Sequence, residues 1–178
     1  MPGDVTAFAA QDLVLIDALL AVVAVVYLLY RRPRAFILRW VIAVVVVVIV
    51  GFVAAKIGAA VYTDPRPFTT DHIRPLVSHA PDNGFPSDHA LLAAAIVAAV
   101  ALVSPLWSLP FVLLGFLVDW ARVGAGIHHV ADVVGSALFV ALGLLIAVFV
   151  APLIVSWLSR RISGRLRGGA ASGAQRPR

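Results

Sequence analysis

Three short polar clusters interrupt an otherwise apolar chain, and together they hold the residue types of an anion site with a nucleophile. Their sequences are KIGAAVYTDPRPF (residues 56–68), GFPSDH (residues 84–89) and ARVGAGIHHVAD (residues 121–132). Positive charge comes from Lys56, Arg66 and Arg122. Guanidinium groups in particular match phosphate oxygens and bind them through paired hydrogen bonds. The clusters therefore predict a site for a phosphorylated substrate.

The third cluster has the spacing of a nucleophile with its orienting group. His128 and Asp132 are four residues apart, so on a helix they share one face. The carboxylate can then hold one ring nitrogen of His128 and direct the other outward, as a nucleophile or a base. His89 in the second cluster is a second imidazole and is available as a general acid.

Ser87 precedes the apolar run that follows the second cluster. Free backbone N–H groups and the helix dipole at such a helix start favour a phosphate. A purely structural interpretation is also open, because Ser and Asp are common N-caps and Pro suits a helix start. The two interpretations are compatible, since a capping serine can open a helix that holds phosphate.

Single polar residues elsewhere are given structural interpretations. An Arg at a membrane boundary usually anchors there, with its stem in lipid and its charge in water. Asp119 is expected to pair with Arg122, three residues later on the same helix. His129 is expected to face away from the edge that carries its neighbour. No role is assigned to the loop residues His72, Arg74 and His79. Only the joint occurrence of three clusters in order on one face favours the chemical interpretation.

The composition is that of an integral membrane protein. The chain of 178 residues is 62% hydrophobic and 13% charged, and its mean hydropathy is +1.01. A water-soluble domain cannot bury so much apolar surface. The net charge of +5 does not indicate nucleic acid binding, because the basic residues cluster beside apolar segments. The chain has no cysteine, which excludes disulfides and thiol chemistry.

Five apolar segments predict an all-α integral membrane protein, a bundle of about five transmembrane helices with six as the alternative. Helices are expected because an open chain in lipid must satisfy its backbone groups internally. The third and fourth segments are short for a span of roughly 17–25 residues, so tilt or flanking residues must supply the rest. The segments are residues 13–30, 35–62, 89–103, 106–121 and 130–158.

The arginines predict the orientation in the cell membrane. Of the fourteen basic residues, four lie at or near the junction of the first two segments (Arg31, Arg32, Arg34 and Arg39) and six lie from residue 160 to the C-terminus. The positive-inside rule places both regions in the cytoplasm and the three polar clusters on the periplasmic or exterior side. Residues 1–162 are predicted to form one transmembrane domain. Residues 163–178 are predicted to form a disordered, basic cytoplasmic tail.

The three clusters resemble the tripartite signature of the type 2 phosphatidic acid phosphatase superfamily. That signature is a Lys followed by Arg-Pro, then Pro-Ser-Gly-His, then Ser-Arg, five residues, His, three residues and Asp. This chain matches it in order with Arg66-Pro67, with residues 86–89 (PSDH), and with Arg122, His128 and Asp132. Within the superfamily, PSDH and the preceding DNGF look most like the bacitracin-resistance type of undecaprenyl-diphosphate phosphatase.

Three positions depart from the signature. The family Lys usually lies seven residues before the Arg, which is Ala59 here, and Lys56 lies one helical turn deeper. One helical turn is ~5.4 Å long, and the Lys56 side chain can extend outward over that distance. Ala121 replaces the usual Ser and removes one hydrogen bond. Asp88 replaces Gly and adds negative charge beside the phosphate, and no role is assigned to it.

The resemblance implies hydrolysis of a lipid-linked phosphate, most specifically of undecaprenyl diphosphate, without a cofactor or a metal ion. His128 would attack phosphorus to form a phosphohistidine, Asp132 would orient it, and His89 would act as acid and then base. The implied phosphate-binding groups are Lys56, Arg66, Arg122 and the backbone N–H of Ser87. The sequence also shows no carboxylate cluster suited to Mg²⁺.

Other functions remain open at this point. Phosphatidylglycerophosphate or phosphatidate could be the substrate of the same chemistry. A small transporter or proton-relay protein would carry ionisable residues along both halves of its helices, and the inner halves here are nearly free of them. A structural membrane protein would not need the His128–Asp132 pair behind an arginine. The sequence does not determine the oligomeric state.

Overall fold

The computed structural model describes residues 2–71 and 73–173, with side chains from residue 3 to residue 161; His72 lies outside the described residues. The elements are all helices, in the order α1 (Pro2–Gln11), α2 (Leu13–Leu29), α3 (Arg34–Val61), α4 (Pro67–Thr70), α5 (Asp88–Ala101), α6 (Pro105–Gly124) and α7 (Val130–Gly173). The prediction of an all-α membrane protein is confirmed. The five apolar segments correspond to α2, α3, α5, α6 and α7.

Three of these helices are long and apolar enough to cross a membrane alone: Arg34–Val61, Pro105–Gly124 and Val130–Arg161. A fourth span is possible if α1 and α2 count as one, because they are joined at a bend of 50°. The 14 residues of α5 rise about 21 Å at ~1.5 Å per residue. That length is short of a hydrocarbon core of about 30 Å, so α5 depends on its flanks to cross, as its sequence indicates.

Helix α1 was not predicted from the sequence, because its segment PGDVTAFAAQ carries less apolar character than the spans. The predicted tail beginning at residue 163 lies in the helical backbone of α7 as far as Gly173, and residues 174–178 lie outside the described part of the chain. The division into a membrane domain and a separate disordered tail therefore stays a prediction.

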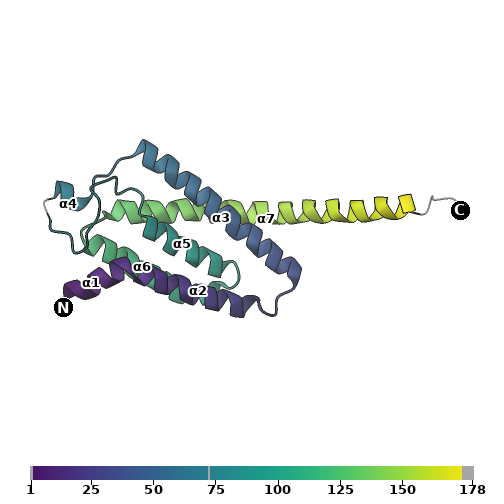
Figure 1. Cartoon of the computed structure of the whole chain (residues 1–178), viewed down its shortest axis with the longest axis horizontal. Helices are drawn as coiled ribbons and strands as arrows, with labels where there is room; N and C mark the ends of the chain where they lie inside the picture. The colour runs from purple at the N-terminus through teal and green to yellow at the C-terminus, as the bar shows by residue number, and fades with distance from the viewer. Residues whose placement is uncertain (1, 72, 174–178) are drawn as a thin grey trace.

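The loop between α3 and α5 and the connection between α6 and α7 lie at one end of the bundle (Figure 1). The loop after α3, the short helix α4 and the start of α7 lie at the end opposite the C-terminus, and α1 lies at the same end. Helix α3 packs most extensively against α7, while α5 packs against both α6 and α7. The three polar clusters lie at the end of α3, at the start of α5 and between the end of α6 and the start of α7, so this arrangement brings them together.

Small side chains allow the helices to approach closely where α3, α5 and α7 meet. The buried core there consists of Ala43, Val47, Ala98, Val140, Ala147 and Ala151. Gly143 on α7 lies so near α3 that an added Cβ would be 2.6 Å from the carbonyl oxygen of Val47. Small residues at crossings of this kind are typical of membrane bundles, where close packing rather than hydrophobicity drives association.

The long loop between α3 and α5 is fixed to both of its neighbours. Asn83 accepts a hydrogen bond from the Asp64 backbone N–H at 2.9 Å and donates to the Tyr62 carbonyl at 3.2 Å. Farther along the loop, the Leu76 N–H donates to the Ala125 carbonyl at 3.0 Å, just after α6. These contacts close the loop over the ends of α3 and α6.

Candidate active site

His128 and Asp132 form a buried pair at the start of α7. The Nδ1 atom of His128 lies 3.1 Å from Oδ2 of Asp132, and their side chains are 2% and 0% exposed. The same oxygen accepts the His129 backbone N–H at 2.9 Å. Helix α7 begins at Val130, so His128 precedes the helix and the pair forms across its first turn. The Asp132 carboxylate thus binds the His128 ring and the His129 backbone N–H, in the two residues that precede α7.

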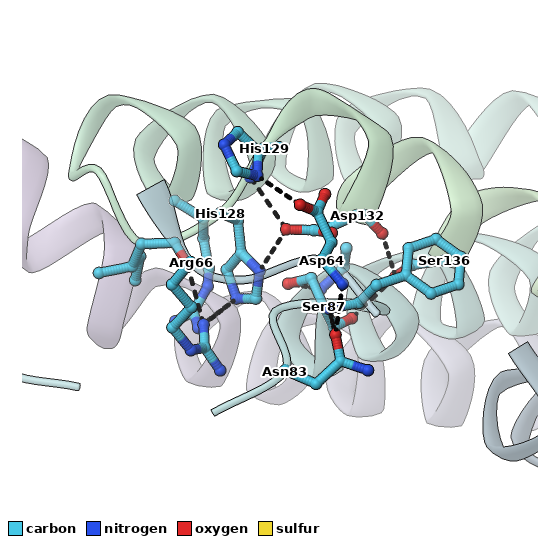
Figure 2. Close-up of polar contacts among 12 residues, drawn as sticks. Asp64, Arg66, Asn83, Ser87, His128, His129, Asp132 and Ser136 are labelled. Atoms are coloured by element: carbon cyan, nitrogen blue, oxygen red, sulfur yellow. Dashed lines mark hydrogen bonds and ion pairs between the residues drawn. The ribbon is translucent and has the colours of Figure 1, made fainter. Parts of the chain in front are cut away.

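Two guanidinium groups face the other ring nitrogen of His128 (Figure 2). Its Nε2 lies 3.2 Å from Nη1 of Arg66 and 3.0 Å from Nη2 of Arg122. A guanidinium group can only donate hydrogen bonds, so Nε2 must be the acceptor and Nδ1 must carry the ring proton. Nδ1–H then donates to Asp132. The lone pair of Nε2 is therefore directed at a pair of buried cations.

Both arginines are held by oxygen atoms from distant parts of the chain. Arg66 donates to the Ile127 carbonyl at 2.9 Å and to the Asp82 carboxylate at 2.7 Å. Arg122 donates to the Ala10 carbonyl at 2.9 Å, so α1 helps to position it. The expected pairing of Asp119 with Arg122 was wrong. Oδ1 of Asp119 is buried and has no hydrogen-bond partner among the described residues, because Arg122 turns toward His128 and α1 instead.

The surroundings of His128 keep its ring neutral. Burial lowers the pKa of His128, and the positive charges of Arg122 and Arg66 lower it further, against the opposing hydrogen bond to Asp132. A neutral ring leaves the Nε2 lone pair free for chemistry near pH 7.

His79 lies beside this pair, although sequence reasoning gave it no role. Its ring meets that of His128 edge to face, with 6.3 Å between the centroids. Burial and the charges of Arg66 and Arg122 lower the pKa of His79 as well. No spacing rule could have found it, because a loop residue has no periodicity that relates it to a distant helix.

Ser87 is the N-cap of α5 and is fully buried. Its Oγ accepts the Ala90 N–H at 3.5 Å, and its carbonyl accepts the hydroxyl of Ser136 at 3.0 Å. Its backbone N–H is directed to the Asp132 carbonyl at 3.4 Å. The capping interpretation describes this geometry, and Ser87 ties α5 to α7 beside the His128–Asp132 pair. Phosphate binding by its N–H stays a prediction.

The remaining two predicted residues differ in their placement. His89 is half-buried on α5, within electrostatic reach of Arg122 and His128, and its ring lies against the Gln11 backbone. Lys56 is exposed on α3, and its ammonium lies 5.1 Å from the centre of the Phe52 ring. Among the described residues, no contact joins Lys56 to the other site residues, so its phosphate role stays a prediction that this geometry does not support.

Two acidic residues that sequence reasoning left without a site role complete this end of the bundle. Asp82 pairs with Arg66, and the guanidinium hydrogen bond holds the pKa of this carboxyl below its usual range. Asp64 pairs with His129, with 3.1 Å between Oδ1 and Nδ1. The ring of His129 thus faces Asp64 rather than the arginines. Gly84 permits this crowding, since an added Cβ would lie 3.0 Å from Oδ2 of Asp132.

A search of protein families matches residues 40–163 to the PAP2 superfamily. This segment runs from within α3 to within α7 and contains all three polar clusters. No solved structure gives a significant match to the chain.

Three curated proteins are similar to the chain over most of its length. Undecaprenyl-diphosphatase BcrC of Bacillus subtilis is 34% identical over 119 residues, covering 67% of this chain and 55% of the relative. Bacitracin transport permease protein BcrC of Bacillus licheniformis is 36% identical, covering 74% and 63%. Putative undecaprenyl-diphosphatase YbjG of Escherichia coli is 30% identical, covering 79% and 69%. The matched part of the chain thus spans less than two thirds of the first two relatives.

Proposed function

Because the chain belongs to the PAP2 superfamily, we propose that it is a membrane phosphatase that converts undecaprenyl diphosphate to undecaprenyl phosphate. The observation that carries the chemistry is the position of His128, with Nδ1 on Asp132 and Nε2 between two guanidinium groups. The substrate is suggested by two relatives, undecaprenyl-diphosphatase BcrC and putative undecaprenyl-diphosphatase YbjG.

In the first step His128 is the nucleophile. Its Nε2 lone pair forms a bond to the terminal phosphorus, and the bond from that phosphorus to the bridging oxygen breaks. The leaving group is undecaprenyl phosphate, and His89 donates a proton to its departing oxygen. The ring of His128 becomes a phosphoimidazolium, whose positive charge the Asp132 carboxylate stabilises through Nδ1–H.

In the second step water releases the phosphate. His89, now neutral, accepts a proton from water, whose oxygen forms a bond to phosphorus while the bond to Nε2 breaks. Inorganic phosphate leaves and His128 returns to its neutral form. One residue serves as acid and then base because the second step reverses the direction of proton transfer in the first.

The arginines supply the stabilisation of charge at phosphorus. Arg66 and Arg122 contact Nε2 before substrate binds, so their donors already lie where the equatorial phosphoryl oxygens will develop charge. Preorganised cations in a buried site stabilise such a transition state strongly, because they need little reorganisation. We propose that these two side chains make the reaction independent of a metal ion.

A lateral groove between α5, α6 and α7 is suited to the lipid part of the substrate. Its volume is about 360 Å³ and its walls are mainly small apolar side chains, including Ala93, Gly115 and Ala137. Asp119 also lines it, one turn of α6 before Arg122. The groove therefore leads from the apolar middle of the bundle toward the site.

The test is phosphate release by the purified protein from three lipids: undecaprenyl diphosphate, phosphatidylglycerophosphate and phosphatidate. We expect the highest kcat/KM with undecaprenyl diphosphate, and release that is lost in His128→Ala. A higher kcat/KM for either phospholipid would replace the proposed substrate. Release that survives in His128→Ala would contradict the mechanism.

A further inference from the structure

Three side chains that can each offer a ligand atom to a metal ion converge behind the His128–Asp132 pair. A ring nitrogen of His129 and one carboxylate oxygen each from Asp64 and Asp132 lie within 4.8 Å of one another. Figure 2 shows the three side chains next to each other, on the side of Asp132 away from Arg66. They come from the loop after α3, from the residue before α7 and from its first turn.

One buried oxygen of this cluster has no donor. Oδ1 of Asp132 is buried and has no hydrogen-bond partner among the described residues, whereas Nδ1 of His129 lies 3.1 Å from Oδ1 of Asp64. The side chain of Asp132 is 0% exposed, so water does not solvate that oxygen. A buried acceptor without a donor is destabilising, and more so when it is charged. The cluster therefore has the chemistry of a site that a cation completes.

The cluster is both fixed and reachable. Oδ2 of Asp132 is held by His128 and by the His129 N–H, and the Asp64 backbone is held by Asn83. The side chains of Asp64 and His129 are 15% and 34% exposed, so an ion can enter from the aqueous side.

We propose that Asp64, His129 and Asp132 form an inhibitory binding site for a divalent transition-metal ion of the Zn²⁺ class. One imidazole nitrogen with two carboxylate oxygens is a ligand set that Zn²⁺ accepts, whereas Mg²⁺ prefers oxygen ligands with several waters. The 3.1 Å between Nδ1 of His129 and Oδ1 of Asp64 is near the separation of two ligands that each lie about 2.0–2.2 Å from one zinc ion. Water would fill the fourth position.

Binding there would act on catalysis through Asp132. A metal ion on this carboxylate takes up the negative charge that otherwise orients His128 and stabilises its ring when it becomes charged. The ion would therefore slow phosphoryl transfer without touching the substrate. This regulatory effect rests on the proposed function, whereas binding of the metal does not.

Binding is tested first, by titrating the detergent-solubilised full chain, without a polyhistidine tag, with Co²⁺ as a spectroscopic probe and then displacing it with Zn²⁺. We expect one saturable site in the wild type. Asp64→Asn and His129→Ala should each weaken binding by roughly tenfold or more. His79→Ala removes another imidazole at the same end of the bundle and should leave the affinity unchanged. Absence of saturable binding, or a loss in His79→Ala alone, would overturn the site.

The effect on catalysis is tested separately. Zn²⁺ should inhibit phosphate release by the wild type, and EDTA should restore it, while His129→Ala should retain turnover and lose the inhibition. Inhibition that persists in His129→Ala, or binding without inhibition, would overturn the regulatory role. If no lipid phosphate is hydrolysed at all, the proposed function fails, and the Co²⁺ titration still decides whether the metal site exists.

Discussion

Arg66 forms an ion pair with Asp82, with 2.7 Å between Nε and Oδ1, and the two side chains are 6% and 60% exposed. The same guanidinium faces Nε2 of His128, with 3.2 Å between Nη1 and Nε2. An exposed carboxylate therefore occupies a donor of the arginine that is expected to bind phosphate, and it competes with the substrate for that donor.

Asp82→Asn should lower KM, because it removes the competing charge from Arg66. Exposed ion pairs contribute about 0.2–1 kcal/mol, so we expect a decrease of about two- to fivefold with little change in kcat. Steady-state kinetics on the lipid diphosphate measures this. Asp71→Asn removes a charge from the same loop, at a residue that does not pair with Arg66. An equal decrease in both variants would show an effect of net charge alone.

The pH dependence should follow the lowered pKa of His128. The ring must be neutral at Nε2 to attack, and a lowered pKa keeps it neutral to lower pH, so the acidic limb of kcat/KM should lie below the ordinary His range near pH 6.5. Arg66→Gln removes one of the charges that lower this pKa and should move the limb to higher pH. A limb that stays in place or moves to lower pH contradicts this account.

His128→Ala should abolish turnover, whereas His129→Ala should retain most of it. Loss of a covalent nucleophile lowers kcat by about a thousandfold or more. The backbone N–H of residue 129, which holds Asp132 at 2.9 Å, remains in the alanine variant. Single-turnover phosphate release measures both. Equal losses in the two variants would mean that the wrong histidine has been assigned as nucleophile.

Lys56→Ala should have little effect, because the Lys56 side chain is exposed and packs on Phe52. Ala59 lies nearer the site, since its carbonyl accepts from Asn83 at 3.4 Å. Adding Ala59→Lys to the Lys56→Ala chain should therefore lower KM by placing an ammonium close to the phosphate. If Lys56→Ala by itself loses activity, the phosphate role predicted from the sequence is restored.

The site should open to the periplasm or exterior, as the arginine distribution predicts. Ser78 and Ser159 are exposed near opposite ends of the bundle, and the chain has no native cysteine. Ser78→Cys should react with a membrane-impermeant thiol reagent in intact cells. Ser159→Cys should react only after permeabilisation. The reverse pattern would invert the topology and favour a lipid phosphate of the cytoplasmic leaflet.

Hydropathy and residue type were enough to predict the five apolar helices and the chemical character of the clusters. Both are local properties: a run such as VVVVVIV (residues 44–50) must be helical in lipid whatever it contacts. The spacing of His128 and Asp132 also predicted their contact, although it forms across the first turn of α7 rather than along a helix face. Two residues that are four positions apart remain close whether both lie in the helix or one of them precedes it.

Only the tertiary structure decided which other side chains join them. His79, Asp82 and Asp64 reach the site because the loop after α3 is tied to α3 by Asn83 and to the end of α6 by Leu76. Arg122 turns to Ala10 because α1, which the sequence did not indicate, folds against α6. Lys56 is exposed on α3 and packs on Phe52 instead. A loop sequence has no periodicity from which its path can be predicted, because its contacts depend on residues far away in the chain.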